Sequence, residues 1–215
     1  MTDGPLTIVA KKYVGAGLCA LPAVQAEKRP ALNEWKVYQS RLPTEAEIDA
    51  WFANGPDGLC LLAGAASGNL EMIDFDFAGE AFLRWEKKVQ EAAPGLFDRL
   101  VIETSQSGGW HVVYRSETEV CGSLKLARRR QNVAEKDIFV EDEKEYVRLH
   151  GKKYLAQADI DGTKYVIITL IETRGRGGIF LCHPTAGYEL VQGRFDHPPV
   201  LTGAQRETLL RSAWE

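Results

Sequence analysis

LEMIDFDF, at residues 70–77, alternates between apolar side chains and acids from Ile73 onward. Successive side chains of a β-strand point to opposite faces, so Asp74 and Asp76 share one face while Ile73 and Phe75 lie on the other. The two carboxylates are then about 6 to 7 Å apart along the strand. They repel each other, and each is pushed toward protonation unless a cation lies between them. Oxygen ligands of this kind suit Mg²⁺ or Mn²⁺, and the alternative is the exposed polar face of a half-buried strand.

A second segment, SQSGGWH at residues 105–111, places two glycines after Ser107 at the start of a predicted strand. Gly108 and Gly109 would let backbone amides approach an anion closely, and His111 would point from the strand beside that loop. A phosphate-sized anion stabilises the charged form of an imidazole, which can then donate a hydrogen bond to it. The alternative is an ordinary turn followed by a packed histidine.

A third segment, ITLIETRGRGG at residues 168–178, is an apolar strand that ends in a carboxylate followed by arginines in a glycine-rich turn. Glu172 and Arg174 share a strand face. One interpretation is a strand-end salt bridge, which is common and weak. The other is that Glu172 is a third metal ligand and that the guanidinium of Arg174 holds phosphate oxygens beside it.

Turn formers divide the rest of the chain into short strands and helices. Thr44, with Glu47 three residues later, and Thr202 are expected to cap helices. The predicted helices are residues 44–52, 79–92 and 202–213. The predicted strands are residues 59–63, 69–77, 100–103, 110–115, 138–140, 146–147, 165–172 and 179–181. The first two and the last two strands are expected to form hairpins, and residues 1–40 a loop that leads into a short helix at Trp35. Strand pairs mixed with helices favour an α+β or mixed α/β domain over a doubly wound one.

The composition is that of an ordinary globular protein, because 45% of the 215 residues are hydrophobic and 26% are charged. A chain of this kind is not expected to be mainly disordered. No apolar run reaches the roughly 20 residues that span a bilayer, and the N-terminus lacks the apolar segment of a secretion signal, so a cytoplasmic protein without a membrane partner is expected. The four cysteines and four histidines form no metal-binding motif, so any metal site must rest on carboxylates.

The formal net charge of −4 argues against a protein that coats nucleic acid through bulk electrostatics. Positive charge is nevertheless concentrated in SLKLARRRQN, at residues 123–132. Its basic residues are Lys125, Arg128, Arg129 and Arg130. They form either a solvated loop or a patch that contacts a nucleic-acid backbone.

In this order, the three segments resemble the motifs of the archaeo-eukaryotic primase superfamily, and in particular the prim-pol domain of phage, plasmid and mobile-element primase-helicases. The family motifs are a D-x-D strand, here IDFD at 73–76, an S-G-G-x-H element, here SGGWH at 107–111, and an acid after a hydrophobic residue, here Ile171 and Glu172. The flanks are similar too: KRP at 28–30 with Trp35, LAG at 62–64 with SG at 67–68, and ETRGRGG at 172–178. HPT at 183–185 departs from the family's Pro-Pro-Ser. The resemblance runs from about residue 15 to the end.

The resemblance implies a single prim-pol catalytic domain over residues 1–215, with a core at 15–200 and a C-terminal helix at 201–215 that could lead to a helicase or accessory region. The implied fold is an RRM-like antiparallel sheet subdomain joined to a smaller α/β subdomain. Asp74, Asp76 and Glu172 would be the catalytic residues and would hold two Mg²⁺ or Mn²⁺ ions. The implied nucleotide-binding residues are Ser107, Gly108, Gly109, His111 and Arg174. Lys28, Arg29 and the basic residues of 125–130 are expected to contact the template or primer backbone.

The implied activity is that of a DNA primase-polymerase, which transfers a nucleotide from an NTP or dNTP to a 3′-hydroxyl during phage or mobile-element replication. The implied partners are a single-stranded DNA template, a primer strand, nucleoside triphosphates and a fused or associated helicase. The isolated domain is expected to be a monomer in the cytoplasm of a bacterial, archaeal or phage-infected cell. A metal-dependent nuclease is one alternative, but it has no obvious use for the S-G-G-x-H loop. A non-catalytic nucleic-acid-binding module is another, although the presence of all three acids favours retained chemistry.

Overall fold

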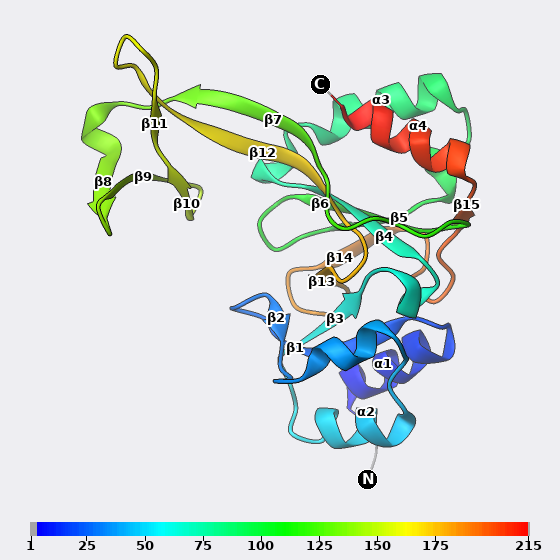
Figure 1. Cartoon of the computed structure of the whole chain (residues 1–215). Coiled ribbons are helices and arrows are strands. Elements are labelled where there is room, and N and C mark those ends of the chain that lie inside the picture. Colours follow the sequence, from blue (N-terminus) through cyan, green and yellow to red (C-terminus); the bar gives the residue numbers. More distant parts are fainter. Residues whose placement is uncertain (1–3, 215) are drawn as a thin grey trace.

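A large β-sheet packs against a smaller one, and an arm projects from the large sheet (Figure 1). The computed structural model describes residues 4–214. The central strands of the large sheet, in spatial order, are β12 (Lys164–Arg174), β4 (Leu70–Phe75), β6 (Trp110–Ser116) and β5 (Val101–Thr104), each antiparallel to its neighbours. At the margins lie β7 (Lys125–Asn132), β11 (Gln157–Ala158), β14 (Glu189–Gln192) and β15 (Val200–Leu201), of which β15 runs parallel to β6. The predicted α+β class is confirmed.

The smaller sheet has the order β13 (Ile179–Leu181), β3 (Gly58–Leu62), β1 (Cys19–Val24) and β2 (Arg29–Pro30). Helices α1 (Pro5–Gly15) and α2 (Glu45–Phe52) pack on it, because Tyr13 of α1 and Ile48 of α2 belong to the same buried cluster as Leu61 of β3. The same cluster includes Met72 and Val113 of the large sheet. One hydrophobic core therefore joins the two sheets.

The prediction of a loop over residues 1–40 is wrong for α1, β1 and β2. The helix has the sequence PLTIVAKKYVG, in which β-branched residues lower the intrinsic helix propensity. Burial of Ala10 and Tyr13 against the smaller sheet stabilises it instead. Residues 1–3 and 215, which the predicted domain and its terminal helix include, lie outside the described residues.

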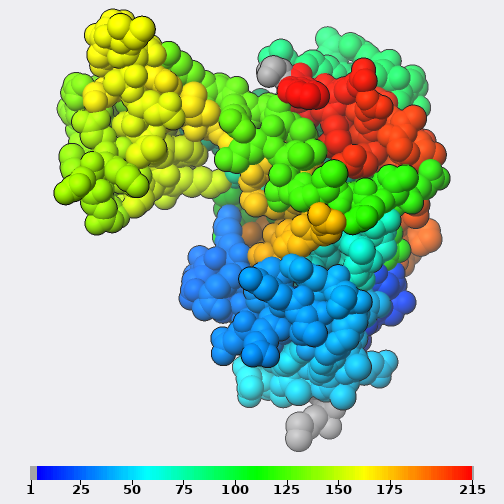
Figure 2. Space-filling model, viewed as in Figure 1, coloured from blue at the N-terminus to red at the C-terminus, as the bar shows by residue number. Residues whose placement is uncertain are grey.

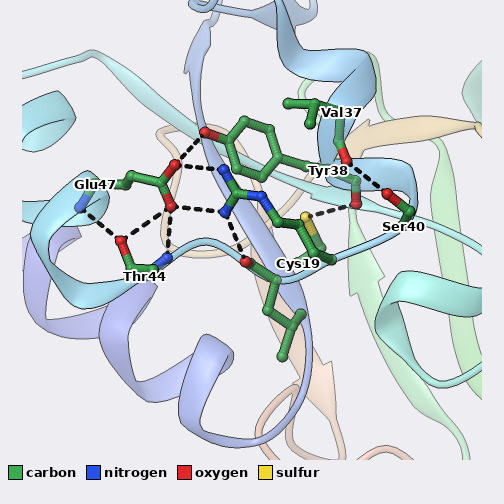
Figure 3. Close-up of polar contacts among 8 residues, drawn as sticks. Cys19, Val37, Tyr38, Ser40, Thr44 and Glu47 are labelled. Carbon is green, nitrogen blue, oxygen red and sulfur yellow. Dashed lines mark hydrogen bonds and ion pairs between the residues drawn. The ribbon is translucent and has the colours of Figure 1, made fainter.

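The predicted start of α2 at Thr44 is confirmed. The Thr44 hydroxyl accepts the backbone N–H of Glu47, and the Glu47 carboxylate accepts the backbone N–H of Thr44, which is a capping box. The same carboxylate accepts two hydrogen bonds from Arg41 and one from the Tyr38 hydroxyl. Figure 3 shows the Glu47 carboxylate between Tyr38 and Thr44. This network ties α2 to η1 (Trp35–Gln39), the short helix predicted at Trp35.

Both predicted hairpins are wrong, because the strands of each pair belong to different sheets. β3 and β4 share only an isolated bridge between Gly64 and Leu70, and β13 pairs with β3 rather than with β12. Between β3 and β4, Ser67 is fully buried: its hydroxyl donates to the Leu62 carbonyl and accepts the N–H of Cys19. The small residues that suggested a tight turn thus form a crossing from one sheet to the other.

The other face of the large sheet packs on α3 (Phe82–Ala92) and α4 (Gly203–Ala213) (Figure 1). Phe75 of β4 lies in one buried cluster with Trp85 of α3 and Leu209 of α4, and the Trp85 indole N–H donates to the Leu209 carbonyl at 3.0 Å. The helix predicted at 79–92 is confirmed from Phe82 onward, whereas Gly79 ends a separate 3-10 turn. The helix predicted at 202–213 is confirmed as α4, with the expected cap at Thr202. None of the helices within residues 4–214 is long and apolar enough to cross a bilayer.

The weakly patterned middle of the chain forms the arm. β7 and β12 pair along most of their length, and beyond them lies a three-stranded antiparallel sheet of β8 (Ile138–Glu141), β9 (Lys144–Leu149) and β10 (Lys152–Leu155). Figure 2 shows the arm as a lobe that stands away from the two stacked sheets. The strands predicted at 138–140 and 146–147 are confirmed as β8 and part of β9.

A buried ion pair attaches α4 to the strand that carries the two aspartates. Glu71 of β4 is fully buried, and its carboxylate accepts hydrogen bonds from Arg206 at 2.6 and 2.8 Å and from the Tyr114 hydroxyl at 2.7 Å. A buried carboxylate is tolerated only when it is paired in this way. The contact therefore fixes the helix on the sheet at one point.

Replacing Glu71 with alanine is expected to lower the free energy of unfolding by about 3 kcal/mol or more, because it leaves the guanidinium of Arg206 and the hydroxyl of Tyr114 without their partner. Urea unfolding measures this loss. Glu207→Ala, at an exposed position of α4, the helix that carries Arg206, is the control and should stay within about 0.5 kcal/mol of the wild type. Equal losses of unfolding free energy in the two variants would show that the buried Glu71–Arg206 pair does not stabilise the fold.

Candidate functional site

Four ionisable side chains lie in one row across four neighbouring strands. In the register of the large sheet, Glu172 of β12 is opposite Asp74 of β4, Asp74 is opposite His111 of β6, and His111 is opposite Glu103 of β5. Residues opposite each other on adjacent strands point to the same face of a sheet. The row lies on the face that packs on the smaller sheet, because Met72, two residues before Asp74, belongs to the core between the sheets.

Three carboxylates meet at one end of this row. Asp74, Asp76 and Glu172 each offer an oxygen atom, and these atoms all lie within 4.8 Å of one another. Asp76 follows the last residue of β4, and its backbone N–H donates to the Leu170 carbonyl of β12 at 3.0 Å. The predicted convergence of three acids that are distant in sequence is therefore present.

Burial raises the pKa of Asp74 above its ordinary value, and the charge of Asp76 adds to the rise although His111 opposes it. Burial also raises the pKa of Glu172, against the opposing charge of Arg174. Keeping Asp74 and Glu172 ionised therefore costs free energy, and a bound cation would offset that cost. An oxygen-only set of this size fits a hard divalent ion, so the cluster could hold a metal.

Protein cations lie against the same carboxylates. Arg174 places Nη2 at 2.5 Å from Glu172 and 3.6 Å from Asp74, as expected for residues on one strand face. Lys152 of the arm places Nζ at 2.6 Å from Asp76. The acid side chains keep between 14% and 19% of their surface exposed, so solvent and ions can reach them. A bound divalent ion could therefore replace Arg174 and Lys152 as the partner of these carboxylates.

A cavity of about 290 Å³ adjoins the cluster where the two sheets and the arm meet. Asp74, Asp76 and Arg174 contribute from the large sheet, Phe180 from the smaller sheet, and Lys152 from the arm. Its other polar lining residues include Lys28, Ser105, Ser107 and His111. Carboxylates and cations side by side in one cavity suit a ligand that carries both divalent ions and phosphate groups.

The turn between β5 and β6 differs in one respect from the sequence expectation. The N–H of Gly108 donates to the Ser105 carbonyl at 2.9 Å, so this amide already has a partner within the turn. Gly109 is needed for packing, because a Cβ there would overlap the carbonyl oxygen of Phe75, next to Asp76. The side chains of Ser105 and Ser107, 3.2 Å apart at their hydroxyl oxygens, line the cavity.

His111 is held by a buried glutamate that the sequence analysis did not single out. Its Nδ1 lies 2.7 Å from one carboxyl oxygen of Glu103, and the other oxygen accepts the backbone N–H of His183 at 2.9 Å. The ring nitrogen Nε2 lies 3.8 Å from Asp74. Glu103 is fully buried, and the only sequence signal was a charged residue within the apolar strand VIET.

The environment of His111 favours the imidazolium. Burial alone would lower the pKa of His111, but the hydrogen bond that its Nδ1–H donates to Glu103 and the charge of Asp74 outweigh burial and raise that pKa above its ordinary value. His111, which faces the cavity beside the carboxylates, therefore stays positively charged up to a higher pH than a free histidine does.

The basic residues predicted to contact nucleic acid lie in several places. Lys28 lines the cavity, whereas Arg29 pairs with Glu27 on the surface. The cluster of residues 125–130 is part of strand β7, so the interpretation as a solvated loop is wrong. Within it, Arg129 pairs with Glu80 and Arg130 with Asp159, while Lys125 and Arg128 are exposed.

Residues 10–201 match the family model of the bifunctional DNA primase/polymerase N-terminal domain, Prim-Pol. The chain belongs to the Prim-Pol family. The match includes both sheets, the arm and every residue of the row, which confirms the resemblance seen in the sequence. No curated protein sequence matches the chain. Membership in Prim-Pol assigns the chain to the DNA primase/polymerases, with DNA and nucleotides as the substrate classes.

Replacing Glu103 with glutamine is expected to lower the pKa of His111, because the loss of the carboxylate leaves burial as the larger influence. Titration of the His111 ring by NMR, without divalent ions, measures the change. Since the folded pKa is raised, the charged ring stabilises the wild-type fold below the unfolded pKa, and this stabilisation is lost as pH rises through the folded value. Glu71→Gln, equally buried on the opposite face, should leave the titration unchanged; an unchanged titration in Glu103→Gln would refute the assignment.

Proposed function

We propose that the chain is a primase-polymerase catalytic domain that transfers a nucleotide from an NTP or dNTP to a 3′-hydroxyl opposite a DNA template. Asp74, Asp76 and Glu172 would hold two Mg²⁺ or Mn²⁺ ions. Such a pair lowers the pKa of an attacking hydroxyl and neutralises a leaving pyrophosphate. The observation that carries the proposal is the convergence of the three carboxylates beside a cavity that is also lined by Lys28, Lys152, Arg174 and His111.

The protein's own side chains would bind and orient the substrate. The imidazolium of His111 and the hydroxyl of Ser107 would donate to phosphate oxygens, with Gly108 and Gly109 shaping the turn that presents them. Arg174, once released from Glu172, would add a guanidinium at the same place. Glu103 would keep the ring of His111 oriented toward the cavity.

The template and primer would contact basic residues outside the cavity. Lys125 and Arg128 are exposed on β7, and Arg29 is exposed on β2, so all three can reach a phosphate backbone. Lys28 lies in the cavity and is better placed for the nucleotide than for the template. Residues 1–215 would act as one domain. The monomeric state, the associated helicase, the phage or mobile-element context and the cytoplasmic location remain predictions from the sequence.

Primer extension on a DNA template, with ribonucleotides or deoxynucleotides and with Mg²⁺ or Mn²⁺, tests the activity. Extension should stop when a chelator removes divalent ions. A product ladder on an unprimed template would establish priming. Strand cutting without nucleoside triphosphates would instead indicate a nuclease, and DNA binding that is indifferent to divalent ions, without any synthesis, would indicate a non-catalytic module.

Asp74→Asn, Asp76→Asn and Glu172→Gln are each expected to lower kcat/KM for extension by at least about 100-fold, because each removes one negative charge from the ligands of the two metal ions. Circular dichroism should show an unchanged fold. Asp98→Asn, at an exposed position outside the cavity, is the matched control and should keep full activity. Retention of more than a few per cent of activity in any of the three variants would defeat the assignment of that residue.

A further inference from the structure

The arm stands away from the two sheets (Figure 2). One of its side chains nevertheless reaches the carboxylate cluster. Lys152 is the first residue of β10, and its ammonium lies 2.6 Å from Asp76. It lines the same cavity as Asp74, His111 and Arg174. About half of its side-chain surface is exposed, so the ammonium remains accessible from the cavity.

The direction of Lys152 follows from strand alternation in β10. The next residue, Lys153, points to the other face, where its ammonium pairs with Glu141 at 2.7 Å and lies 4.4 Å from the ring centre of Tyr146. Two adjacent lysines of one strand therefore serve different environments. One faces the cluster, and the other remains within the arm.

Contacts at the base of the arm hold Lys152 in this position. His150, in the turn before β10, packs edge-on against the ring of Phe77 at 4.4 Å between ring centres. Arg129 of β7 lies 4.7 Å from the centre of the same ring and pairs with Glu80. Phe77 directly follows Asp76 in the chain. The arm is thus attached to the segment that ends the D-x-D strand.

We propose that Lys152 binds the triphosphate of the incoming nucleotide, so that the arm completes the nucleotide site. The inference rests on the proposed nucleotidyl transfer. Divalent ions that bind Asp76 would replace the ammonium as the counter-charge of that carboxylate. The released lysine then lies beside the cavity, where it acts as a compact positive charge for phosphate oxygens. Together with His111 and Arg174 it would place cations from three separate strands around one anion.

The test compares Lys152→Ala with Lys153→Ala in primer extension. Lys152→Ala is expected to raise KM for the nucleotide by roughly ten- to a hundred-fold, the range expected for loss of one charged hydrogen bond, with little change in KM for the primed template. Lys152→Arg should recover most of the loss, and Lys153→Ala should match the wild type. Equal nucleotide KM values in Lys152→Ala and Lys153→Ala, or a loss confined to KM for the template, would overturn the proposal.

Two further measurements separate this role from folding and from the proposed activity. Mn²⁺ binding to the protein without nucleotide should be at least as tight in Lys152→Ala as in the wild type, because a cation that competes for Asp76 has been removed. Weaker Mn²⁺ binding would show that the variant damages the cluster itself. Equilibrium binding of a fluorescent dNTP tests Lys152 without any turnover. If the wild type bound the dNTP but did not extend primers, the proposed function would fail, and the lysine comparison would still decide the inference.

Discussion

The register of the large sheet is the constraint on which the site depends. Because side chains alternate between faces, a shift of one residue in β4 would turn Asp74 away from Glu172 and His111. Apolar neighbours fix the register: Met72 on one face is buried between the sheets, and Phe75 on the other is buried beneath α3 and α4. The hydrophobic effect that folds the two cores thereby also aligns four ionisable groups from four different strands.

Electrostatics then determine what the aligned groups can do. The carboxylates repel one another in a partly buried place, and the charges of Arg174 and Lys152 offset that repulsion. His111 keeps its charge because buried Glu103 is its partner. Acids and cations therefore coexist at one cavity, and divalent ions together with an anionic nucleotide would satisfy both sets by exchange of partners. The same logic explains why a chain with a net negative charge can act on polyanions.

The sequence predicted what depends on local pattern. Local sequence patterns predicted the D-x-D strand, the capped helices α2 and α4, the three converging segments and the family. Strand alternation, capping residues and motif order can all be recognised in consecutive residues. One hairpin was predicted where Ser67 and neighbouring glycines instead carry the chain from β3 to β4 in the other sheet. Helix α1 was missed because tertiary packing outweighs its low intrinsic helix propensity. Glu103 and Lys152 were missed because a cross-strand partner and the path of the arm set their positions.

Anomalous diffraction from crystals grown with Mn²⁺ and a non-hydrolysable nucleotide tests the central claim most directly. The account predicts two Mn²⁺ peaks about 3.5 to 4 Å apart, bound by oxygens of Asp74, Asp76 and Glu172, with the triphosphate in the adjoining cavity. Arg174 and Lys152 should then have left the carboxylates for phosphate oxygens. Carboxylates that kept their pairs with Arg174 and Lys152, with no Mn²⁺ between them, would contradict it.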